Sequence, residues 1–253
     1  MSAFYQIIDE ICQEENISIE KLSDNWILRL KKDEKQTFFY GKLGNLNSAA
    51  SGHIASDKAA TYSLLTANNI PAIPHFLIHK KELQKTQSLK KQSYPLIIKP
   101  NHGERGIDIF LCKNEKESKE KIANLLDKYE SVCFSPYFEA KFEYRCFYLD
   151  GKIYFSYRKN KTDNSIFFNL CRGAKPSLVD QKDEKIKAIN KLAIDAAKSI
   201  GIRFAAIDIL ESKTRDFKVL EINQAFGVDK LIDAIPEAYE EIKELYRQAI
   251  IKM

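Results

Sequence analysis

The segment FKVLEINQAFG, residues 217–227, decides the fold, because it ends an apolar strand with two side chains that carry oxygen ligands. Alternate residues of a strand point to the same side, so the Glu221 carboxylate and the Asn223 carboxamide face one spot. The segment AAIDIL, residues 205–210, places Asp208 in a second apolar strand, and we expect the two strands to form a hairpin. Two adjacent buried carboxylates would raise each other's pKa unless a cation neutralised them. The hairpin therefore predicts a site for a divalent cation, and Mg2+ is favoured because it takes about six oxygen ligands.

A lysine and a glycine-containing loop lie upstream, in PLIIKPNHGERGIDIF at residues 95–110. Lys99 ends an apolar strand, where its ammonium group must either reach solvent or meet an anion. Gly103 and Gly106 allow positive φ angles and let backbone N–H groups approach phosphate oxygens. The loop matches neither GxxxxGK[ST] nor GxGxxG, the usual nucleotide-binding motifs. A plain hairpin turn is therefore an alternative interpretation of this segment.

Charged residues that suit anion binding also occur between these two regions. Glu143 and Arg145 share one face of the strand segment KFEYRCFYL, although a cross-strand ion pair would give the same pattern. Further on, Arg158, Asn169 and Arg172 follow within one stretch. Arginine forks bind phosphate and carboxylate oxygens, but a surface loop would have the same composition.

The composition of the chain is that of a globular protein, with 253 residues, 44% hydrophobic residues and a formal charge of +5. This charge permits an anionic ligand without indicating nucleic acid. No apolar run approaches the roughly 18 to 20 residues of a membrane helix, and the first residues are acidic where a signal peptide would be basic. We therefore expect a cytoplasmic protein. The cysteines show no CxxC spacing and are expected to be buried, reduced thiols: Cys12, Cys112, Cys133, Cys146 and Cys171.

Helices and strands are expected to alternate along the chain. Residue periodicity predicts short paired strands over 26–41 and an antiparallel strand pair that turns at Asp150 and Gly151. A polar surface helix is expected over 79–92. The other expected helices cover residues 3–16, 57–65, 116–129, 185–201 and 236–253.

The order of these motifs resembles the ATP-grasp superfamily. Lys58 in DKAATY, Lys99 in IIKP, the GERG loop, FEYR, NLCRGA, Asp208 and LEIN follow one another over about 170 residues, from Asp57 to Gly227. The chain looks most like the carboxylate–amine ligase branch, which includes ribosomal-protein glutamate ligases and the ATP-grasp part of cyanophycin synthetase. The resemblance implies an α+β fold in which two α+β subdomains grip ATP, after a short N-terminal α/β segment. The implied boundaries are 1–56 for the N-terminal segment, 57–132 for the small lid subdomain and 133–253 for the C-terminal subdomain.

The resemblance also implies roles for individual residues. Lys58 and Lys99 would contact ATP phosphates under the glycine loop, the segment FSPYF would meet adenine, Leu220 would pack beneath the base and Glu143 would accept from the ribose. Arg145, Arg158 and Arg172 would face the transferring phosphate or the acceptor carboxylate. Asp208, Glu221 and Asn223 would hold two Mg2+ ions, with Mn2+ as an alternative metal. The full set of implied ATP-binding residues is Lys58, Lys99, Gly103, Glu104, Arg105, Gly106, Ser135, Tyr137, Phe138, Glu143, Asn169 and Leu220.

The implied reaction joins a small-molecule carboxylate to an amine, such as an amino acid or a peptide, through an acyl phosphate and with release of ADP. An ATP-grasp kinase acting on a hydroxyl group, and a nucleotide-binding regulator without turnover, are the alternatives. Phe226 stands where many family members carry proline, so the resemblance does not define the part of the site that binds the acceptor. The short N-terminal segment makes a homodimer an additional expectation, because a partner subunit could complete the substrate site.

Overall fold

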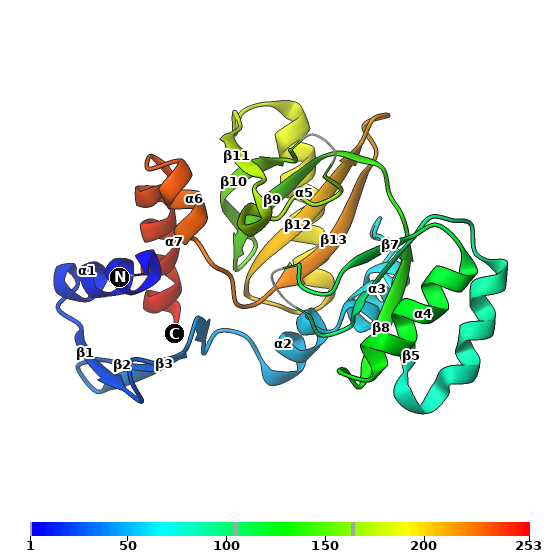
Figure 1. The fold of residues 1–253 in the computed structure, drawn as a ribbon. Helices are drawn as coiled ribbons and strands as arrows, with labels where there is room; N and C mark the ends of the chain where they lie inside the picture. Colours follow the sequence, from blue (N-terminus) through cyan, green and yellow to red (C-terminus); the bar gives the residue numbers. More distant parts are fainter. Residues whose placement is uncertain (1, 104–105, 163–164) are drawn as a thin grey trace.

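The chain forms three units that lie side by side in the computed structural model, which describes residues 2–103, 106–162 and 165–253 (Figure 1). The N-terminal unit contains the first helix and a small sheet, and the last two helices of the chain pack against it. The central unit is a five-stranded sheet with one long helix, and the lid unit is a second, four-stranded sheet with its own helices. This mixture of helices and antiparallel sheets confirms the predicted α+β class.

The N-terminal unit is built around an amphipathic helix. Phe4, Ile7, Ile8 and Ile11 recur at helical spacing and are fully buried, in one core with Tyr246 of the closing helix. The four strands pair in the order β1-β2-β3-β4. The elements are α1 (Ala3–Glu14), β1 (Ser18–Leu22), β2 (Ile27–Lys32), β3 (Lys35–Tyr40), β4 (Leu43–Gly44), α6 (Asp229–Ala234) and α7 (Ala238–Lys252).

The central sheet has the order β11-β10-β9-β12-β13, and its neighbouring strands are antiparallel. Helix α5 covers one face, where Ile189 and Ala193 pack against Cys146 and Ile207. The other face carries the charged residues described below. The elements are β9 (Ala140–Leu149), β10 (Lys152–Asn160), η2 (Leu170–Arg172), β11 (Lys175–Leu178), α5 (Glu184–Ser199), β12 (Phe204–Ser212) and β13 (Phe217–Asn223).

The lid unit has the strand order β5-β8-β6-β7, with α4 packed on its core. Asp57 caps α3 through the backbone N–H of Ala60, as the sequence predicts. The segment expected to be a polar surface helix is a 3-10 helix instead, with a non-helical residue at Glu82. The elements are β5 (Phe76–His79), η1 (Lys80–Lys91), β6 (Leu96–Pro100), β7 (Phe110–Cys112), α4 (Glu115–Leu126) and β8 (Ser131–Pro136). Helices α2 (Ala49–Ser56) and α3 (Lys58–Ala67) precede the lid sheet, and Ala55 and Leu65 on them pack in the core of the central unit.

Within the described residues, no helix is long and apolar enough to cross a membrane. All five cysteines are free thiols, and four are buried as predicted. Cys171 is the exception, because it lies exposed in η2 on a surface loop, so the prediction of burial was wrong for this residue.

Candidate functional site

The three predicted metal ligands converge on the face of the central sheet opposite α5. Asp208 of β12 lies directly opposite Glu221 of β13 in the strand register. The Asn223 amide nitrogen is 3.3 Å from an Asp208 oxygen and 3.4 Å from a Glu221 oxygen. The hairpin inferred from FKVLEIN therefore brings two carboxylates and one carboxamide to a single spot, as the alternation of side chains requires.

Two protein cations already neutralise Asp208. The Arg145 guanidinium donates to both of its oxygens, at 2.8 and 2.6 Å, and the Lys159 ammonium lies 3.0 Å from one of them. Burial would raise the pKa of Asp208, but the charges of Arg145 and Lys159 outweigh it and hold the pKa below its usual value. The pKa of Asp208 is therefore not raised, as it would be for two adjacent carboxylates without a neutralising cation.

Glu143 completes this polar cluster, which consists of Glu143, Arg145, Lys159, Asp208, Glu221 and Asn223. Its carboxylate forms an ion pair with Lys159, and both side chains are buried. Burial raises the pKa of Glu143 to about 7, even though the charge of Lys159 acts in the opposite direction. Glu143, Lys159 and Asp208 are buried, whereas Arg145, Glu221 and Asn223 are half-buried. The buried charges of the polar cluster need polar or ionic partners.

The sequence did not predict Lys159 as a site residue; it predicted the neighbouring Arg158. With Lys152 opposite Leu149, a regular hairpin would set Arg158 opposite Glu143. A β-bulge between Ile153 and Phe155 adds one residue to β10 and sets Lys159 there instead.

Arg158 lies on the opposite face of the sheet, paired in register with Tyr144. Its guanidinium stacks over the Phe142 ring at 4.4 Å, and its Nε donates to Ser177. The structure therefore does not bring Arg158 to the polar cluster, and the predicted position of this arginine is corrected. A bulge inside a hairpin leaves no clear signal in a single sequence.

Lys99 of the lid unit faces the polar cluster. It is 5% exposed, and among the described residues no carboxylate forms an ion pair with it. Burial lowers the pKa of Lys99, whereas the thiol of Cys133 and the charge of Glu221 act to raise it. A buried cation of this kind is suited to an anionic ligand.

The glycine loop, which contains Gly103 and Gly106, contacts Lys58 and also the segment that holds Asn169 and Arg172. The Lys58 ammonium donates to the carbonyl oxygens of Asn101 and Gly103, at 3.1 and 3.0 Å. A Cβ atom added to Gly106 would lie 3.4 Å from the amide nitrogen of Asn169 and 3.5 Å from Nε of Arg172. Gly103, Gly106, Asn169 and Arg172 therefore border one region, while Glu104 and Arg105 lie outside the described residues.

An apolar cluster lies on the same face of the central sheet as the polar cluster. Leu220 and Phe138, both predicted to meet the base, pack in it together with Phe168. Phe168 was not selected from the sequence, because an aromatic residue in a loop gives the same signal as an ordinary core residue. The cluster consists of Ile73, Phe138, Ala140, Phe168, Leu210 and Leu220.

The segment that joins the lid sheet to β9 holds the remaining predicted contacts. The Ser135 hydroxyl is buried and has no hydrogen-bond partner among the described residues. The backbone N–H of Tyr137 donates to the carbonyl oxygen of Pro95 at 3.0 Å. An unpartnered buried hydroxyl is uncommon in a protein interior and is consistent with a missing ligand.

Solved structures with a similar fold include ligases. D-alanine–D-alanine ligase from Bacillus anthracis superposes with a TM-score of 0.61 at 18% identity, covering 78% of this chain and 71% of that protein. The same enzyme complexed with ATP gives a TM-score of 0.56. At this level of identity the likeness concerns the fold alone.

The chain belongs to the RimK-like ATP-grasp domain family, whose model matches residues 55–240. A probable alpha-L-glutamate ligase of Pasteurella multocida is 27% identical over 188 residues, which are 74% of this chain and 58% of that protein. A glutamate–LysW ligase of Sulfurisphaera tokodaii is 29% identical over 212 residues, covering 79% and 73%. The chain spans 58 to 61% of the length of the first four curated relatives that it matches.

Proposed function

We propose that this protein is an ADP-forming carboxylate–amine ligase that uses ATP and Mg2+. The observation that carries the proposal is the convergence of Asp208, Glu221 and Asn223 opposite the buried cation Lys99. Family membership supports it, because the relatives described above are named as glutamate ligases.

The donor set suits Mg2+, which prefers carboxylate and carboxamide oxygens and keeps water or phosphate oxygens as its other ligands. Asp208, Glu221 and Asn223 would hold the metal, and a half-turn of the Asn223 amide would present its oxygen in place of its nitrogen. The metal would supply charge neutralisation for the phosphates. The unpartnered Ser135 hydroxyl and the apolar cluster around Leu220 are suited to the adenine end of ATP.

The residues of this chain would act mainly by positioning and by charge. Lys99 offers its ammonium to the phosphate groups, and Gly103 and Gly106 let the loop backbone approach them. Arg145 and Arg172 would stabilise negative charge on the transferring phosphate or on the acyl group. Closure of the glycine loop against Asn169 and Arg172 would exclude water from the acyl phosphate.

Glutamate is the first substrate to test, because it appears in the names of the relatives. The acid substrate would be a small carboxylate or the end of a peptide. A kinase that phosphorylates a hydroxyl group could use the same ATP-binding residues. Hydroxylamine distinguishes the two activities: a ligase yields a hydroxamate by trapping the acyl phosphate, whereas a phosphorylated hydroxyl survives.

The decisive experiment incubates the protein with ATP, Mg2+ and a panel of amino acids and peptides, and follows ADP together with the mass of the products. Asp208→Asn and Glu221→Gln should each reduce ADP formation by about a hundredfold or more while the protein stays folded, since each removes a charged metal ligand. Arg158→Met is the matched control, because Arg158 lies on the other face of the sheet and should not be needed. Full activity in both acidic-residue variants would refute the proposed site.

A further inference from the structure

Arg145 and Lys159 occupy the oxygens that a metal ion would need. We propose that these two residues act as resident cations, which compete with the divalent metal for Asp208 and thereby make metal binding depend on nucleotide. This inference rests on the proposed function, since it concerns the same metal site. It adds an order of events: the metal binds weakly to the free protein and tightly together with a nucleotide that draws the resident cations away.

The contacts around Asp208 support this competition. Arg145 bonds both oxygens, at 2.8 and 2.6 Å, and Lys159 adds a contact at 3.0 Å. Asp208 is 1% exposed and Lys159 is 3% exposed, so water does not screen their attraction. A metal ion that binds Asp208 must therefore replace strong, dry ion pairs.

The site holds enough cations to offset its carboxylates without a metal. The carboxylates of Glu143, Asp208 and Glu221 lie near Lys99, Arg145 and Lys159, and the charge of Lys58 also acts on Lys99. A lone divalent ion would add two positive charges to this excess of cations, which is costly in a medium of low dielectric constant. A nucleotide phosphate tail brings several negative charges and offsets the excess.

Lys159 can separate from Asp208 and still keep another ion-pair partner. Its ammonium also pairs with Glu143, which lies directly opposite it in the strand register. A lysine is a point charge on a flexible stem, so a small movement can separate it from Asp208 while it stays with Glu143 or turns to a phosphate. Arg145 has no second carboxylate bond among the described residues, and a phosphate would have to replace Asp208 as its partner.

Equilibrium dialysis of the whole chain with Mn2+, with and without ADP, tests this inference. The wild-type protein should bind Mn2+ at least about tenfold more tightly with ADP than alone. Without nucleotide, Lys159→Met should bind Mn2+ at least about tenfold more tightly than wild type, because one competing charge is gone. Arg158→Met removes a neighbouring cation from the other face and should match wild type.

Arg145→Met provides a second test that does not depend on the folding of the Lys159 variant, and it should also bind nucleotide-free Mn2+ more tightly. Thermal unfolding confirms that each variant is folded. If neither variant gains affinity for Mn2+, or if wild type binds Mn2+ equally well without ADP, the inference is overturned while the metal site stands. If wild type binds no Mn2+ even with ADP, the proposed metal site itself fails, and the inference with it.

Discussion

The surroundings of Gly106 and Phe226 explain why these residue types occur at these two positions. Gly106 has a φ angle of +71°, in the left-handed region, and its Cα faces Asn169 and Arg172. Phe226 is a different case, since its ring packs against Phe147, Phe204 and Tyr246. A proline at this position could not supply those ring contacts. Phe226 therefore belongs to the core that joins the N-terminal and central units.

Gly106→Ala should weaken the closure of the glycine loop. A Cβ atom in the left-handed region costs about 1 kcal/mol, and here it would also come into van der Waals contact with Asn169 and Arg172. We expect a higher KM for ATP with little change in Tm. Gly201→Ala is the matched control, because Gly201 has a φ of +68° with no atom within 4 Å of the added Cβ. Equal KM values in the two variants would contradict the role of this contact.

Phe226→Ala should destabilise the protein by about 3–5 kcal/mol, the usual cost of emptying an aromatic site in a packed core. Phe226 is 4% exposed. Urea denaturation measures the loss. A change in the free energy of unfolding below about 1 kcal/mol would show that neighbouring side chains fill the cavity or that the ring contributes little to stability.

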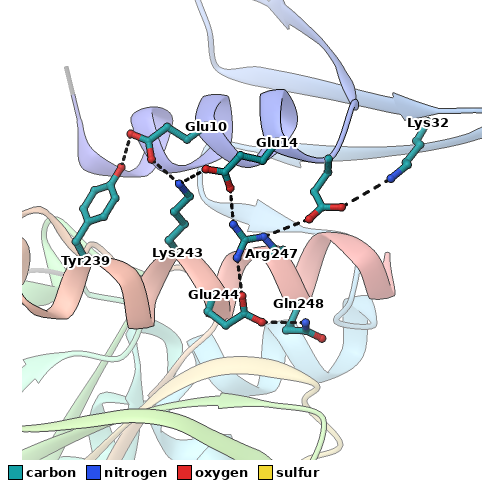
Figure 2. A network of polar contacts seen from close by, with 9 residues as sticks. Glu10, Glu14, Lys32, Tyr239, Lys243, Glu244, Arg247 and Gln248 are labelled. Carbon is teal, nitrogen blue, oxygen red and sulfur yellow. Dashed lines mark hydrogen bonds and ion pairs between the residues drawn. The ribbon is translucent and has the colours of Figure 1, made fainter.

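At the scale of elements, α1 is attached to α7 by a polar network that lies beside their shared core (Figure 2). The Lys243 ammonium bridges Glu10 and Glu14, at 2.8 and 2.6 Å, and Lys243 is only 6% exposed. Tyr239 donates to Glu10 at 2.8 Å. Arg247 extends the network to Glu15, so the network fixes the position of α1 along α7.

The strength of this network should depend on pH. Hydrogen bonds from Lys243, Gln6 and Tyr239 lower the pKa of Glu10 from its usual 4.5 to about 2. Because the folded-state pKa is the lower one, the contribution to stability is complete above about pH 4.5 and is lost as the pH falls toward 2.

Lys243→Met should therefore lower the Tm by a few degrees at neutral pH, and by progressively less below pH 4.5. Thermal unfolding of both proteins across this range measures the difference. Lys230→Met is the control, because Lys230 forms an exposed pair with Asp233 on α6. A difference in Tm that stays constant down to pH 2 would argue against the ion pairs as its cause.

At the scale of the molecule, the N-terminal and central units share one hydrophobic core. Residues of α1 and β2 pack with Phe147 and Phe204 of the central sheet and with Tyr246 of α7. The lid unit has a separate core, built from β5, β6, β8 and α4. We therefore expect the first 44 residues to unfold together with the central unit, although the implied boundaries treat residues 1–56 as a separate segment.

The single tryptophan gives a direct test of this expectation, because Trp26 lies in the N-terminal unit and packs edge-on against Tyr40. In urea, its fluorescence transition should coincide with the main far-UV circular dichroism transition. An earlier fluorescence transition, with little loss of circular dichroism, would show that the N-terminal unit unfolds alone.

The sequence was sufficient for those parts of the fold and site that depend on local patterns. The apolar runs with Asp208 and Glu221 predicted a hairpin, and alternation alone placed Asn223 beside Glu221. The sequence could not show that Arg145 and Lys159 neutralise Asp208, because that depends on pairing between strands far apart in the chain. The exposed position of Cys171 likewise depends on the path of a loop.

The bulge in β10 has a consequence for comparing this chain with its relatives. Tyr154 is the spare residue of the strand, so a protein that lacked it would still set the equivalent of Lys159 opposite Glu143. Alignments of homologues should accordingly permit a one-residue gap at this position. An ungapped alignment from the hairpin turn would match Lys159 to the wrong column and hide a shared lysine.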